Sequence, residues 1–154
     1  MRTADQWFEI YGESHRNATN KAIHWICIPL IVLSTLGILQ AIPVPGATPY
    51  LHLGTVVSVV ALVFYARLSP TIFAGMAAVS ATCLAINGAI ALSGGSIGWI
   101  SAGIFAVAWA AQFVGHKIEG KKPSFFQDLQ FLLIGPAGLL QFAFRKVGIP
   151  VTTA

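Results

Sequence analysis

Two long stretches of the chain contain no Lys, Arg, Asp or Glu, and they constrain the fold more than any other feature. One runs from Ala22 to Ala66 and the other from Leu68 to His116. A helix needs about 20 apolar residues to cross a bilayer core of roughly 30 Å, so each stretch is long enough to cross and return. Each also contains a turn signal, at Pro43–Gly46 and at Ser93–Ser96. The sequence therefore predicts an integral membrane protein.

The composition excludes an ordinary soluble domain. Only 9% of the residues are charged and 56% are hydrophobic, whereas soluble domains carry about 25% charged residues. The net charge of +4 comes from basic residues that flank the apolar stretches and form no continuous stripe, so we predict no nucleic-acid partner. A length of 154 residues fits one membrane-embedded domain, residues 1–154.

We predict an all-α helical bundle with four transmembrane helices, at Ile23–Ile42, Leu51–Arg67, Thr71–Leu92 and Ile97–Gly115. A fifth apolar segment, Leu129–Phe144, is interrupted by Gly135-Pro136. There we predict a broken helix that re-enters the membrane or lies at its interface, with a short fifth span as the alternative. Alanines at every fourth residue, from Ala77 to Ala89 and from Ala102 to Ala110, are expected to let helices approach closely.

This topology gathers the charge on one side of the membrane. If the last helix does not cross, all nine Lys and Arg residues share one face, and the two opposite loops carry no charge. The positive-inside rule then makes the charged face cytoplasmic. We expect the chain in a bacterial inner membrane or in the endoplasmic reticulum, with its site facing the cytoplasm.

Three of the four histidines map to this charged face, and His52 maps to the other. His15 and His24 precede and open the first span, and His116 follows the fourth. Imidazoles and carboxylates are ligands for iron and zinc. A histidine at a membrane interface also occurs without any ligand role, with its polar ring atoms toward the headgroups. His15 and His24 are nine residues apart, about 180° of helix rotation, so they can share an ion only across a bend or from two helices.

Other polar residues share helix faces with these histidines. Tyr11 and His15 are four residues apart, as are Asn20 and His24. Gln112 and Glu119 lie four residues before and three residues after His116, so the three form one stripe at the end of the fourth span.

Two segments around the histidines resemble a known family, the fungal endoplasmic-reticulum 2-hydroxy fatty acid dioxygenase and its bacterial relatives. The segments are Ser14–His24, followed by Pro29, and Trp109–His116, followed by Glu119 and Pro123. The stretch from Asp128 to Pro136 is similar to the closing segment of the family. The resemblance covers the chain from about Phe8 to Phe144.

The resemblance implies a membrane enzyme that uses Fe(II) and O2 to shorten a 2-hydroxy fatty acid by one carbon, within fatty acid α-oxidation. By position, His15, His24 and His116 would hold the iron and form the catalytic centre. Glu119 stands one position earlier than the acidic residue of the family, which favours a supporting role over direct ligation. The same supporting role is expected of Tyr11, Asn20 and Gln112. The substrate carboxylate would face three lysines, Lys117, Lys121 and Lys122.

Two other functions remain open from the sequence. One is a zinc-dependent membrane hydrolase that acts on lipids, and the other is a non-enzymatic lipid-binding or assembly protein. Metal analysis and O2 consumption distinguish them from a dioxygenase. The sequence leaves the oligomeric state, the preferred chain length and the source of electrons open.

Overall fold

The computed structural model describes Gln6 and residues 17–120 and 125–151, and for residues 125–132 it describes the backbone alone. This part of the chain contains five long helices and no strand, which confirms the all-α prediction. The helices are α2 (Ala18–Ala41), α3 (Leu53–Leu68), α4 (Pro70–Leu92), α5 (Ile97–Glu119) and α6 (Phe125–Lys146).

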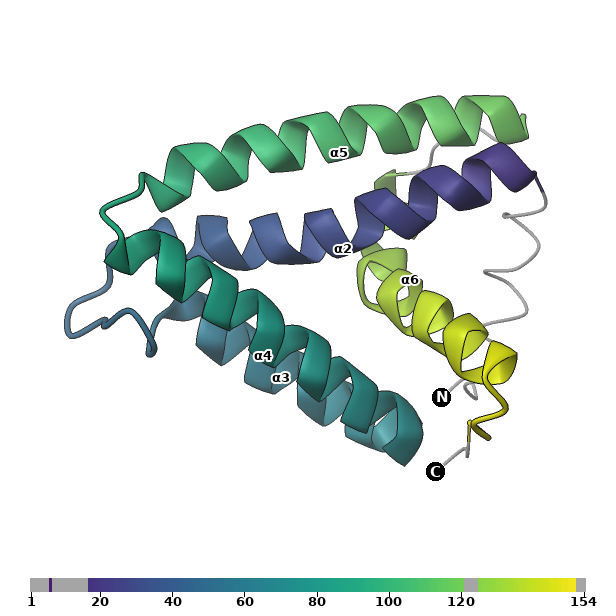
Figure 1. Ribbon diagram of the computed structural model, residues 1–154, viewed down its shortest axis with the longest axis horizontal. Coiled ribbons are helices and arrows are strands. Elements are labelled where there is room, and N and C mark those ends of the chain that lie inside the picture. Colours follow the sequence, from purple (N-terminus) through teal and green to yellow (C-terminus); the bar gives the residue numbers. More distant parts are fainter. Residues whose placement is uncertain (1–5, 7–16, 121–124, 152–154) are drawn as a thin grey trace.

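The helices form two pairs with a fifth helix between them (Figure 1). α2 and α5 run side by side and make the most extensive helix contact in the molecule, and α3 packs on α4. The pairs meet at the end that carries the loops after α2 and α4, and they spread apart toward the other end, where α2 begins and α5 ends. α6 lies in this wider end and contacts both α4 and α2.

Three helices, α2, α4 and α5, are long and apolar enough to cross a membrane. α3 is apolar but has 16 residues, which is about 24 Å of helix. The predicted fourth span therefore stays a prediction, while the membrane-protein class rests on the three longer helices.

The predicted break at Gly135-Pro136 is wrong, because α6 continues through both residues. A proline inside a helix removes one backbone hydrogen bond and crowds the carbonyls of the preceding turn. Here the Tyr65 hydroxyl, from α3, donates to the carbonyl oxygen of Leu133 at 2.8 Å, three residues before Pro136. A neighbouring helix thus supplies a hydrogen-bond donor where proline weakens the backbone hydrogen bonds of α6. Membrane helices tolerate proline in this way.

The helices that carry the histidines extend beyond the predicted apolar spans. α2 begins at Ala18 because the Asn17 side chain accepts from the backbone N–H groups of Thr19 and Asn20. α5 continues to Glu119 and ends at Gly120, whose positive φ of 74° is a conformation that favours glycine. These terminal turns carry most of the candidate site.

The charged residues gather at one end of the bundle, as predicted. Lys21 lies in the first turn of α2, Arg67 and Lys117 lie near the ends of α3 and α5, and Arg145 and Lys146 end α6. This is the end where α2 begins and α5 ends, and the two loops at the opposite end have no charged residue.

The alanine stripes do not form the helix contacts that the sequence predicts. Ala102, Ala106 and Ala110 are all exposed in α5. Close approach occurs instead at glycines, because a Cβ at Gly37 would collide with the side chain of Ser101. The helix positions that need a small residue are therefore the ones that face a partner helix, which spacing alone does not reveal.

Candidate functional site

His24 of α2 and His116 of α5 lie against each other at the charged end of the bundle. Their ring centres are 5.1 Å apart and their planes are nearly perpendicular, at 89°. Two imidazoles that bind one ion, each at about 2.1 Å, place their ring centres roughly 5 Å apart. The structure thus brings together two of the three histidines proposed as ligands, from opposite ends of the sequence.

A backbone hydrogen bond fixes the proton of the buried His24 ring. The Nδ1 atom lies 2.9 Å from the carbonyl oxygen of Asn20, one turn earlier in the same helix. Because a carbonyl can only accept, Nδ1 carries the hydrogen and donates, and in the neutral ring the lone pair is then on Nε2. A histidine that binds a metal through one nitrogen commonly holds its other N–H in this way.

Glu119 connects the end of α5 to the start of α2. Its carboxylate accepts from the backbone N–H of Asn17, at 3.0 and 3.2 Å, and from Nδ2 of Asn20 at 2.9 Å. A negative charge at a helix N-terminus is favourable, because the first N–H groups of the helix have no partner within it. Asn20 therefore joins Glu119 to His24, through its side chain on one side and its carbonyl on the other.

Gly115 allows this contact between the two helices. Asn20 is fully buried, and a Cβ added to Gly115 would lie 2.5 Å from its Oδ1 atom. The contribution of Gly115 and of the Asn17 backbone could not be read from the histidine spacing. The available signal was a glycine directly before His116 and an N-capping residue one turn before Asn20.

Gln112 lies one turn before His116 on α5 and is 5% exposed. Its Oε1 atom is buried and has no hydrogen-bond partner among the residues that the structure describes. Lys117 is exposed in the last turn of α5, beside His116. The other predicted site residues lie outside the described residues: Tyr11, His15, Lys121 and Lys122.

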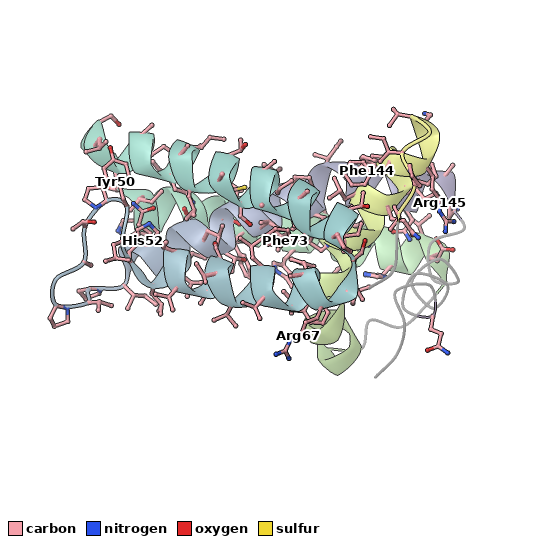
Figure 2. All side chains as sticks on the ribbon, turned by 90° about the horizontal axis from the view of Figure 1, so that it is seen from below. Tyr50, His52, Arg67, Phe73, Phe144 and Arg145 are labelled. Carbon is pink, nitrogen blue, oxygen red and sulfur yellow. The ribbon has the colours of Figure 1, made fainter. Side chains whose placement is uncertain are left out.

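His52 is separate from this site. Figure 2 shows it beside Tyr50, at the end of the bundle opposite Arg145. It is 4% exposed, and neither ring nitrogen has a hydrogen-bond partner. Its place at the uncharged end agrees with the predicted topology and makes it a suitable control for the histidines at the charged end.

An apolar groove of about 580 Å³ also lies between α2 and α5. At about 100° per residue, its walls at Ile23, Ile26 and Leu30 lie on one side of Cys27, and His24 lies on the other. Cys27 belongs to the cluster that joins the two helices. The groove and the imidazoles are therefore on opposite sides of the α2–α5 contact.

The donor set fits a divalent transition metal as far as the structure describes it. The Nδ1 atom of His24 is held by the Asn20 carbonyl, and the ring of His116 lies 5.1 Å from that of His24, centre to centre. Among the described residues, no three His, Cys, Asp or Glu side chains are grouped closely enough to hold an ion. A third protein ligand would thus come from outside that part, where His15 lies. The helix that carries His24, α2, begins at Ala18.

Comparison with known proteins gives one clear result. The family model described as 2-hydroxy-palmitic acid dioxygenase Mpo1-like matches residues 1–147. No curated protein and no solved structure matches the chain. The matched region includes both histidine motifs and the Asn20–Glu119 contact. The chain therefore belongs to the 2-hydroxy-palmitic acid dioxygenase Mpo1-like family.

Proposed function

We propose that this protein is an Fe(II)-dependent dioxygenase that removes one carbon from a 2-hydroxy fatty acid at the cytoplasmic face of a membrane. The observation that carries the proposal is the pairing of His24 with His116. The two residues come from different motifs, and a buried polar network holds the His24 ring in one orientation. The family name supplies the substrate class.

In this proposal His15, His24 and His116 hold the metal, and ligation by two or three histidines with open positions is typical of iron sites that react with O2. Bound Fe(II) would supply the centre at which O2 is reduced. Asn20 and Glu119 keep the His24 ring oriented and its Nδ1 proton in place. Lys117, with Lys121 and Lys122, attracts the substrate carboxylate to the charged end of the bundle.

The overall reaction balances without an added reductant. One 2-hydroxy acid and one O2 give the acid shortened by one carbon, one CO2 and one water. The carbon lost is the original carboxylate, and the carbon that carried the hydroxyl group becomes the new carboxylate. A ratio of one CO2 released for each O2 consumed is the expected stoichiometry.

The test is anaerobic metal analysis of the purified protein, followed by O2 uptake with 2-hydroxypalmitate. We expect bound iron and uptake that depends on the 2-hydroxyl group, with palmitate as the inactive control. His15→Ala, His24→Ala and His116→Ala should each lose iron and activity, whereas His52→Ala should behave like the parent. Bound zinc without O2 uptake would favour the hydrolase, and full activity in any of the three variants would overturn the ligand assignment.

A further inference from the structure

We propose that Gln112 recognises the 2-hydroxyl group of the substrate and so makes the site select 2-hydroxy acids over ordinary fatty acids. This inference rests on the proposed function. It begins with a buried acceptor, because Gln112 is 5% exposed and its Oε1 atom has no donor. A buried acceptor without a donor is costly, and few occur in a folded protein without a functional reason.

Helix geometry places Gln112 on the same side as the imidazoles. Ala108 packs against α2 and marks the contact line on α5. At about 100° per residue, Gln112 and His116 lie about 40° and 80° from Ala108 in one direction. The groove residues Ile104, Val107 and Ala111 lie in the other direction. Gln112 therefore lies on the same side of the α2–α5 contact as His116, away from the groove.

The groups along α5 match the order of groups along a 2-hydroxy fatty acid. Lys117 is at the charged rim, His116 precedes it, and Gln112 is one turn further in, about 5.4 Å along the axis. Aromatic rings in mutual contact continue inward on the same helix, from Phe113, next to Gln112, to Trp109 and Phe105. A ligand with its carboxylate at the rim thus has its hydroxyl group between His116 and Gln112, and its tail along these aromatic rings.

Hydrogen-bond chemistry explains the selectivity. The 2-hydroxyl group provides one O–H donor, and Gln112 provides an acceptor that lacks one. An ordinary fatty acid leaves this acceptor unpaired when its tail excludes water. A site built around a substrate hydroxyl group rejects the analogue that lacks it more strongly than an apolar pocket rejects a missing methylene.

The experiment measures binding of 2-hydroxypalmitate and palmitate to the iron-loaded protein under anaerobic conditions. Gln112→Met keeps the approximate side-chain shape and removes the acceptor, and Gln112→Leu is the second variant if the first fails to fold. We expect the preference for 2-hydroxypalmitate to fall by about 10- to 100-fold. Palmitate should bind more tightly to the variant than to the parent, because no acceptor is left unpaired, and iron content should stay at the parent level.

The matched control is Gln40→Met, because Gln40 also has a buried Oε1 atom without a donor and lies near the C-terminal end of α2, at the opposite end of the bundle. It should keep the parent preference. If Gln112→Met also keeps it, the acceptor holds only a water molecule and the inference is overturned, even when the parent consumes O2. If the parent shows a Gln112-dependent preference but no O2 uptake, the binding role stands and the dioxygenase assignment fails.

Discussion

At the scale of single residues, Glu119 links the C-terminal end of α5 to the N-terminal end of α2. It accepts from the Asn17 backbone and from Asn20, and Asn20 in turn holds His24. Replacing Glu119 by Gln removes the charge and turns one acceptor into a donor. Iron affinity should fall about 10- to 100-fold, as for other groups that orient a ligand, while O2 uptake persists at saturating iron.

A double-mutant cycle tests whether this effect passes through Asn20. Glu119→Gln and Asn20→Ala are measured alone and together by iron titration. Because the two side chains contact each other, their effects should be clearly less than additive. Additive losses would mean that Glu119 influences iron binding by another route.

Sequence reasoning identified the paired residues of the site but not their connections. In a four-span topology His24 and His116 share a membrane face, but counting spans does not place them in contact; the packing of α2 on α5 does. The hydrogen bonds of Glu119 depend on where α2 begins and α5 ends, and neither boundary can be located within a turn from apolar length alone. The structure places both boundaries further out than predicted, at Ala18 and Glu119.

At the scale of helices, the α2–α5 contact depends on Gly115. Gly115→Ala introduces a Cβ that lies 2.5 Å from Asn20 Oδ1, so one helix must shift. Overpacking of this kind costs about 1–3 kcal/mol, and the unfolding temperature in detergent should fall. Gly103→Ala in the same helix is the control, since a Cβ there has no neighbour within 4 Å and alanine favours helix. Equal stability of the two variants would contradict this account.

The contact between α3 and α6 gives a second test at this scale. Tyr65 is 2% exposed and donates to the Leu133 carbonyl beside Pro136. Tyr65→Phe removes the hydroxyl donor from this partly buried acceptor and should destabilise the protein by about 1 kcal/mol. Tyr50→Phe is the control, because Tyr50 is 73% exposed. Chemical or thermal unfolding of both variants provides the measurement, and an unchanged Tyr65→Phe protein would show that α6 needs no such donor.

Predictions from local sequence were wrong where contact with a neighbouring helix determines the structure. Gly135-Pro136 predicts a break, but a side chain that lies 68 positions earlier in the sequence supplies a donor there. Alanines spaced by four residues predict helix contacts, but Ala102, Ala106 and Ala110 stay exposed. Both errors have one cause. Local sequence describes a single helix and does not show which of its faces contacts a neighbouring helix.

For the whole molecule, the strongest determinant is the separation of charge between the two ends. The basic residues that the structure describes lie at the end with His24 and His116, and the opposite loops have none. This separation follows from charge-free stretches that fold back on themselves. The sequence therefore predicted the arrangement of ends well, although it could not show that α6 lies between the two helix pairs.

The same separation predicts which end faces the cytoplasm. Because basic residues stay on the cytoplasmic side, Pro45→Cys and Gly95→Cys should react with a membrane-impermeant maleimide added from outside intact cells. Lys146→Cys should react only after the membrane is opened. The two native cysteines, Cys27 and Cys83, are buried within α2 and α4 and should contribute little background. Outside labelling of Lys146→Cys with protection of the two loops would invert the topology and place the histidine pair on the far side of the membrane.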